Sequence, residues 1–323
     1  MLVVGGSGSI GRPLVDALRR RGHAVVVLGR RKMRLVAGVA YEQGDVRDAD
    51  CLAVIMRHHA VERVVNLAAV LGPAADTPVG VGINFGGAVA VLHAAAEAGV
   101  ERVVQASSMA VYGPTRGAAG YPMFEPIEEE YPRRPDGLYG VAKHAAEEAG
   151  RVAAMAGGLR YCAVRFGPYY GPDKPISGRR GIGALISNAL AALCASEPVR
   201  LPQWTGYRFH PVYVLDAVAA LLSATLSPDL PAPIDPWVHV AGPASTTMGG
   251  VIVTLKEAYP YADIGHERPS PDDRDAVARS SCMVFDDSRA RTLLGYRPRF
   301  GLTQAAQHFL AQPTARAAIE RTI

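Results

Sequence analysis

The chain has 323 residues, a length that favours two lobes, or one domain with large insertions, over a single small core. Hydrophobic residues make up 49% and charged residues 20%, which is typical of a globular protein and excludes a disordered chain. The net charge of +4 is small and dispersed, so the composition argues against a nucleic-acid partner.

The cysteines and the N-terminal residues indicate the cellular compartment in which the protein is expected. The four cysteines, Cys51, Cys162, Cys194 and Cys282, have no CxxC spacing and no nearby histidine in ligand register. We therefore expect free thiols in a reducing compartment and no metal site. No uninterrupted apolar run has the length of a membrane span, and the first residues enter a strand rather than a signal peptide. The expectation is a cytoplasmic protein with no membrane partner.

Short apolar runs alternate with longer amphipathic ones through the first half of the chain. Residues 2–6 predict a strand, residues 10–22 a helix and residues 23–29 a second strand. Further runs follow at 51–59, 61–69, 86–99 and 100–108. The strands are continuous and rich in valine, as in a parallel sheet covered by helices on both faces. Repeated βαβ units therefore predict an α/β fold, a doubly wound parallel sheet that binds ligands at the carboxyl ends of its strands.

The composition of the chain changes near residue 165. Residues 166–181 are rich in glycine, proline and tyrosine, and the helical patterns after them are separated by connections that contain proline. We expect a dinucleotide-binding Rossmann domain over residues 1–165, with a later return near 203–226. A smaller α/β substrate lobe is expected mainly over residues 166–323.

A glycine-rich turn follows the first strand and opens the first helix. Gly5, Gly8 and Gly11 stand there in a GxxGxxG spacing. Small residues at these positions permit a tight turn, the approach of the backbone to a pyrophosphate, and close packing of helix and strand. The turn therefore predicts a dinucleotide-binding site.

A basic turn follows the second strand. NAD-binding proteins usually place an acidic side chain there to accept both ribose hydroxyls, but this chain has Gly29, Arg30 and Arg31. Arg30 is able to meet a 2′-phosphate with two hydrogen bonds, so the turn favours NADP over NAD. The alternative is a solvated arginine pair beside NAD. Asp45, after the expected third strand, either accepts a hydrogen bond from an adenine amine or caps the next helix.

Tyr139 and Lys143 stand four residues apart in a sequence that predicts a helix, so their side chains share one helical face. An ordinary tyrosine has a pKa near 10, which is too high for a base at neutral pH. A neighbouring ammonium and a positively charged nicotinamide both favour the phenolate and lower that pKa. Ser107 and Ser108 end a strand upstream, where a hydroxyl is able to bind a substrate oxygen.

Taken together, these segments resemble the extended short-chain dehydrogenase/reductases, the NAD(P)-dependent epimerase/dehydratase group that includes the nucleotide-sugar 4-epimerases. The resemblance runs nearly end to end, through the glycine-rich turn, 66–69, 83–96, 107–113, 139–143, 165–172, 208–218 and 285–298. It implies an oxidoreductase or epimerase that transfers hydride at a secondary alcohol or ketone of a sugar or nucleotide sugar.

The resemblance also implies roles for individual residues. Tyr139 would be the acid/base, Lys143 would bind the nicotinamide ribose, and Ser108 would orient the reacting oxygen. The implied cofactor site comprises Gly5, Ser7, Gly8, Ser9, Ile10, Gly11, Arg30, Asp45, Val46, Leu67, Ala68, Ala69, Asn84, Ala106, Tyr139, Lys143 and Phe166. The implied substrate site comprises Ser108, Met109, Arg208 and Arg268, with Arg274 as a further candidate. For each arginine the alternative is a surface ion pair.

Three positions depart from the family pattern. The 4,6-dehydratases carry an Asp-Glu pair after the hydroxyl residue, where this chain has Met109 and Ala110, so dehydration of that type is not expected. Pro168 stands where many nucleotide-sugar enzymes have an asparagine that meets the sugar or its phosphate. An NADPH-dependent reductase or dehydrogenase of a non-nucleotide small carbonyl compound is therefore kept as an alternative. A non-catalytic dinucleotide-sensing regulator is a more remote one.

The expected partner is a small-molecule substrate. The alanine-rich segments 86–98 and 140–156 have small apolar faces, and related enzymes pair such helices into a dimer interface. A homodimer is therefore expected, the alternative being that both helices only cover the sheet.

Overall fold

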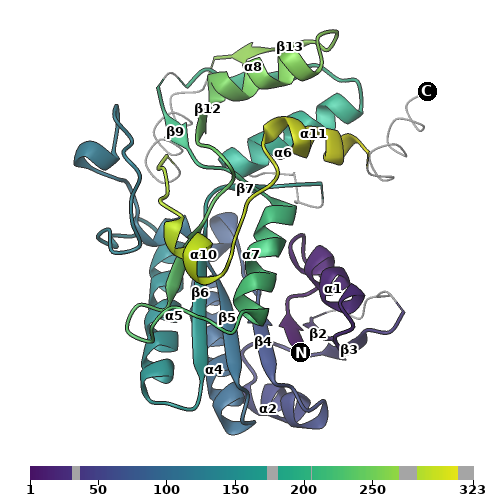
Figure 1. Ribbon diagram of the computed structural model, residues 1–323, viewed down its shortest axis with the longest axis vertical. Coiled ribbons are helices and arrows are strands. Elements are labelled where there is room, and N and C mark those ends of the chain that lie inside the picture. The colour runs from purple at the N-terminus through teal and green to yellow at the C-terminus, as the bar shows by residue number, and fades with distance from the viewer. Residues whose placement is uncertain (31–36, 173–180, 205, 269–281, 312–323) are drawn as a thin grey trace.

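The centre of the molecule is a parallel sheet of seven strands. The structure, a computed structural model, describes residues 1–30, 37–172, 181–204, 206–268 and 282–311. The strand order is β11-β6-β5-β4-β1-β2-β3, and every pairing in this sheet is parallel (Figure 1). The strands are β1 (Leu2–Val4), β2 (Val26–Gly29), β3 (Ala40–Gln43), β4 (Arg63–Asn66), β5 (Arg102–Ser108), β6 (Arg160–Phe166) and β11 (Trp237–Val240). The expected doubly wound α/β fold is confirmed.

Helices cover both faces of the sheet. One face carries α1 (Gly11–Arg20) and α7 (Val214–Leu226), and the other carries α2 (Ala49–His58), α4 (Gly87–Glu97) and α5 (Leu138–Met155). Side chains alternate between the two cores along each strand: Leu2 and Val4 pack on the α2–α4–α5 side and Val3 on the α1–α7 side. Because both faces are buried, β1 and the middle of the inner strands are apolar, whereas the edge strand β3 carries polar residues.

One helical segment of the second face is longer than expected. α3 (Pro78–Val81) continues through a π-helical turn (Gly82–Gly86) into α4. In length and composition this 20-residue segment, in which an 18-residue stretch has a mean hydropathy of 1.6, would be able to cross a membrane, which corrects the expectation that no run has that length. Half of that 18-residue stretch is buried, and α4 packs on α2 and α5 in the layer over the sheet. This is the position of a core helix.

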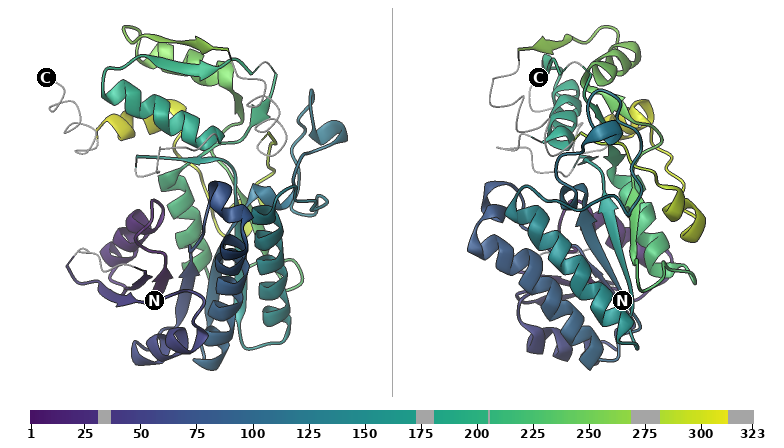
Figure 2. Two further views of the ribbon diagram at one scale, coloured as in Figure 1. Left: turned by 180° about the vertical axis from the view of Figure 1, so that it is seen from behind. Right: turned by 90° about the vertical axis from the view of Figure 1, so that its left-hand side faces the viewer.

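A smaller lobe lies over the carboxyl ends of the strands (Figures 1 and 2). Its helices share one apolar core and are α6 (Ile182–Cys194), α8 (Met248–Ala258) and α11 (Leu302–Leu310). Its short strands pair as β8 (Val199–Pro202) with β13 (Ile264–Glu267), β9 (Arg208–Phe209) with β12 (Thr246–Thr247), and β7 (Tyr169–Tyr170) with β10 (Val212–Tyr213). The chain returns to the large sheet with α7 and again with β11 and α10 (Ser288–Leu293). The second return was not anticipated from the sequence.

Candidate active site

The turn between β1 and α1 wraps around the N-terminus of the helix. The Gly8 amide donates to the Gly5 carbonyl at 3.0 Å, which closes the turn. A Cβ atom on Gly11 would lie 2.6 Å from the Gly5 oxygen, so only glycine fits at this position. The N-cap residue of α1 is Ile10, which has no polar side chain to satisfy the first N–H groups. This arrangement suits the pyrophosphate of a dinucleotide.

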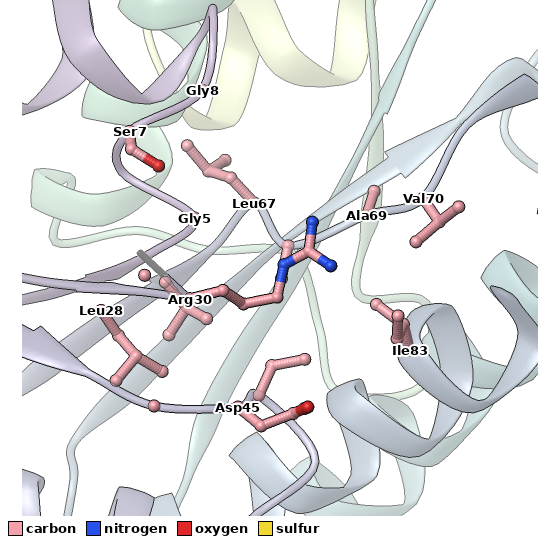
Figure 3. A pocket seen from close by; sticks show the side chains of 15 residues that line it. Gly5, Ser7, Gly8, Leu28, Arg30, Asp45, Leu67, Ala69, Val70 and Ile83 are labelled. Atoms are coloured by element: carbon pink, nitrogen blue, oxygen red, sulfur yellow. The ribbon is translucent and has the colours of Figure 1, made fainter. Parts of the chain in front are cut away.

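A pocket of about 250 Å³ opens beside this turn. The ends of β1, β2, β3 and β4 form it, and its lining includes the predicted cofactor residues Gly5, Ser7, Gly8, Arg30, Asp45, Val46, Leu67, Ala68 and Ala69. Figure 3 shows the Arg30 side chain extending into the space between Leu67 and Asp45. The Asp45 carboxylate accepts two hydrogen bonds from the Arg47 guanidinium, at 2.9 and 2.6 Å, and these lower the pKa of Asp45 to about 2. Asp45 is therefore an ionised acceptor at neutral pH.

A second pocket, of about 790 Å³, lies between the large sheet and the smaller lobe. It shares Gly5, Gly8, Leu67 and Ala69 with the first pocket. Its lining brings together the predicted residues Ser9, Ile10, Gly11, Ala106, Ser108, Met109, Tyr139, Lys143 and Phe166. All three predicted catalytic residues therefore line one cavity with the glycine-rich turn.

Tyr139 and Lys143 lie in the first two turns of α5, as their spacing predicts. The Lys143 ammonium donates to the Ala106 carbonyl at 2.8 Å and lies 5.8 Å from the centre of the Tyr139 ring. The Lys143 side chain is only 2% exposed, and this burial lowers its pKa to about 8, against the opposing effect of the Glu147 carboxylate. Lys143 is therefore protonated at neutral pH and loses its charge as the pH rises through about 8.

The two serines at the end of β5 have different surroundings. Ser108 lines the second pocket, and its Oγ accepts a hydrogen bond from the Ala110 amide at 3.2 Å. Ser107 is 5% exposed, and its Oγ donates to the Glu147 carboxylate at 2.5 Å. Ser107 also lines the second pocket, but its hydroxyl is held by Glu147, and the role of Ser108 toward a substrate oxygen stays a prediction.

Three predicted residues line neither pocket. Asn84 is buried in the π-helical turn, where its side-chain amide binds both backbone polar groups of Val70 at 2.8 and 3.0 Å. It therefore supports a lining residue from behind. Arg208 is exposed and donates to Ser245 Oγ at 3.0 Å, and Arg268 is exposed beyond the end of β13. Arg274 lies outside the described residues, and the substrate-binding role of these arginines stays a prediction.

Several residues that line the second pocket were not predicted from the sequence. Asp76, in the turn after β4, accepts a hydrogen bond from the Tyr139 backbone amide at 3.1 Å and so caps α5, whose own N-cap residue is Gly137. Tyr169 forms a hydrogen bond of 3.1 Å with Ser9 Oγ. The start of α6 adds residues 181–184. Neither long-range contact leaves a local pattern in the sequence.

The chain is similar in sequence to known proteins. The model of the NAD dependent epimerase/dehydratase family matches residues 1–234. A UDP-glucose 4-epimerase from Azospirillum brasilense is 32% identical over 211 residues. That match covers 61% of this chain and 58% of the relative, so the similarity spans somewhat more than half the length of the relative.

Solved structures match over nearly the whole chain. A UDP-glucose 4-epimerase from Thermus thermophilus in complex with NAD aligns with a TM-score of 0.77 at 25% identity, over 96% of this chain and 98% of that one. A GalE-like L-threonine dehydrogenase from Cupriavidus necator in its holo form aligns with a TM-score of 0.83 at 24% identity, over 96% and 98%. The second likeness shows the shared fold.

Proposed function

The chain belongs to the NAD dependent epimerase/dehydratase family, and we propose that it transfers hydride between NAD(P) and a secondary alcohol or ketone of a sugar or nucleotide sugar. The observation that carries this proposal is the presence of Ser108, Tyr139 and Lys143 in one cavity with the glycine-rich turn. The cradle that Gly11 makes possible fits the pyrophosphate of the cofactor.

In the proposed mechanism each residue has a separate task. Ser108 Oγ donates to or accepts from the reacting oxygen and fixes its position. Tyr139 Oη takes the hydroxyl proton during oxidation and returns it during reduction. The Lys143 ammonium, held on the Ala106 carbonyl, binds the nicotinamide ribose and favours a negative charge on the tyrosine oxygen. A bound nicotinamide would supply the carbon that accepts and returns the hydride.

The residues after Ser108 restrict the reaction. Met109 and Ala110 line the second pocket and carry no group that donates or removes a proton. The proposal therefore excludes a 4,6-dehydration, which needs such groups to eliminate water. The proposed site is able to catalyse epimerisation, in which hydride returns to the opposite face of the ketone. It is also able to catalyse a simple oxidation or reduction.

A second candidate function is reduction or oxidation of a small carbonyl compound without a nucleotide. It is supported by Pro168, which lines the second pocket and offers neither an amide side chain nor a backbone N–H to a sugar or phosphate. The name of the Cupriavidus necator relative, an L-threonine dehydrogenase, describes an enzyme of this kind.

The proposed cofactor is NAD or NADP, and Arg30 is the residue expected to distinguish between the two. The family description and the Thermus thermophilus complex name NAD and do not support the preference for NADP that the basic turn suggested. Arg30 nevertheless lines the first pocket, within reach of an adenosine ribose bound along the ends of β1 and β2. The proposed reaction therefore uses NAD or NADP.

Incubation of the purified chain with UDP-glucose, UDP-galactose, other nucleotide sugars and L-threonine tests the proposed function. An epimerase converts one isomer to the other with no net change in absorbance of the reduced cofactor. A dehydrogenase or reductase produces or consumes reduced cofactor in equal amount to product. The absence of dinucleotide binding in a titration with NAD and NADP would contradict both.

A further inference from the structure

Three buried polar side chains lie beside the proposed catalytic residues, and the first of them also lines the second pocket. Ser107 ends β5, Glu147 lies in α5 and Arg165 lies in β6. Arg165 donates to both oxygens of Glu147, at 2.8 and 2.7 Å, and Ser107 donates to one of them at 2.5 Å. The side chains of Glu147 and Arg165 are both 0% exposed.

A fully buried ion pair has a large desolvation cost, so it is not an efficient means of stabilising the contact between three elements. Removing both charges from water costs several kcal/mol for each ion, and an apolar replacement of similar volume is often as stable or more stable. The pair therefore needs an explanation other than stability. Its place suggests one, because the three elements that it joins are those that carry or support the proposed catalytic groups.

Each member of the cluster lies next to one of those groups. Glu147 follows Lys143 by four residues, so it lies one turn farther along the same helical face. Ser107 stands between Ala106, whose carbonyl accepts the Lys143 ammonium, and Ser108. The Arg165 guanidinium completes the cluster from the neighbouring strand.

We propose that Ser107, Glu147 and Arg165 are positioning residues of the reaction: they hold the end of β5 against α5, and Glu147 supplies the negative charge that keeps buried Lys143 protonated. This inference rests on the proposed function, since it assigns the three residues to the same site.

The charged and titratable groups around Lys143 agree with that assignment. Tyr139 and Glu147 face it from α5, Ser107 from β5, and Arg165 stands behind Glu147 on β6. Asn84, in the π-helical turn that packs on α5, is neutral. Burial lowers the pKa of Lys143, and the Glu147 carboxylate acts in the opposite direction. Loss of that carboxylate would leave the Arg165 cation uncompensated and lower the Lys143 pKa further.

The sequence makes a direct measurement practical, since the chain has only four lysines, Lys32, Lys143, Lys174 and Lys256. Full-length protein labelled with ¹³C at the lysine ε-carbon gives four signals, and Lys143→Arg identifies the one from Lys143. We expect Glu147→Gln to lower the titration midpoint of Lys143 from about 8 by about one pH unit. The pH at which turnover falls on the alkaline side should decrease as well. An unchanged midpoint in folded Glu147→Gln overturns the proposal.

If Glu147→Gln does not fold, Ser107→Ala tests the proposal instead, because it keeps the charges of Glu147 and Arg165 and removes one hydrogen bond. We expect its kcat to fall about tenfold through misplacement of the β5 end, with the cofactor affinity unchanged. Thr225→Val is the matched control: it removes a buried hydroxyl that donates to Leu221 within α7, and should leave kcat unchanged. A Ser107→Ala kcat equal to that of the wild type overturns the positioning role. The lysine titration needs no substrate, so it tests the positioning role alone. Failure of the proposed function would instead appear as wild-type protein that has no turnover.

Discussion

At the scale of single residues, the end of β2 has little room for a larger side chain in place of Gly29. A Cβ atom on Gly29 would lie 2.6 Å from the hydroxyl oxygen of Tyr41, which belongs to the neighbouring strand β3. An aspartate or glutamate at this position would therefore require Tyr41 to move. Arg30, one residue later, is the first side chain after β2 that lines the pocket.

Replacement of Arg30 by alanine tests its contact with the 2′ position of the adenosine ribose. We expect Arg30→Ala to weaken NADPH binding about tenfold or more, because a bidentate contact to a phosphate is lost, and to change NADH binding less than about twofold. Fluorescence titration of both reduced cofactors measures the two constants. Arg57→Ala, on the exposed side of α2, is the control. If Arg30→Ala weakens the binding of NADPH and NADH equally, Arg30 makes no contact with the 2′-phosphate and is a solvated residue of the turn.

The sequence was most informative where a residue acts through its local neighbours. The glycine-rich turn and the Tyr139–Lys143 pair were predictable because a turn conformation and a helical spacing place them directly. Asp76 was not, since it acts through a contact with a segment far along the chain. Asn84 was predicted at the cofactor site through the family resemblance, but its hydrogen bonds to the Val70 backbone were not. For Arg208 a position at the start of a strand does not specify where the side chain points, and its guanidinium binds Ser245.

At the scale of elements, three arginines in register join the large sheet to α7. Arg63, Arg102 and Arg160 stand opposite one another on β4, β5 and β6, at the amino ends of the strands. Arg102 is 1% exposed and donates to the carbonyls of residues 224, 225 and 227 at 3.0, 3.0 and 2.7 Å. These carbonyls lie at the C-terminus of α7, where cations are favourable.

Removal of the central arginine should weaken the fold without affecting the site at the opposite edge of the sheet. We expect Arg102→Met to lower the free energy of unfolding by about 2–4 kcal/mol, because three buried carbonyls lose a charged donor. Arg160→Met, an exposed neighbour whose guanidinium also binds a carbonyl, should cost less than about 1 kcal/mol. Denaturant titration measures both. A cost for Arg102→Met no larger than that for Arg160→Met would contradict this interpretation.

The order of elements in the first half of the chain was predictable because most of its strands contain a continuous apolar run and its helices are amphipathic. The exact ends were less so: the predicted first strand extended to residue 6, but the positive φ of Gly5 ends β1 at Val4. The strand β11 was missed because its four residues follow a proline-rich loop, and only its pairing with β6 shows that it belongs to the large sheet.

At the scale of the whole molecule, the outer surface of α5 has an apolar stripe. Leu138, Val141, Val152 and Met155 are 45%, 47%, 59% and 55% exposed, and their spacing places them along one side of the helix. Val89, on the adjacent α4, is 40% exposed. We propose that α4 and α5 form the homodimer interface expected from the sequence, with the stripe at its centre.

Light scattering coupled to gel filtration tests the dimer. The wild-type chain should have twice the chain mass of 34.2 kDa. Val152→Glu combined with Met155→Glu should give the mass of one chain, because the interface would bury two unpaired charges from each protomer. Val253→Glu, on an exposed position of α8 in the smaller lobe, is the control and should stay dimeric. A wild-type mass of one chain would contradict the proposed interface.

If Tyr139 is the acid/base of hydride transfer, as we propose, loss of its hydroxyl in Tyr139→Phe should stop the reaction. The variant keeps the ring that lies beside Lys143 and loses only the hydroxyl. On the substrate that the wild-type protein converts, kcat should fall about 10³-fold, while the affinity for NAD(P), measured by titration, stays within about twofold. If Tyr139→Phe keeps the wild-type turnover, Tyr139 is not the acid/base.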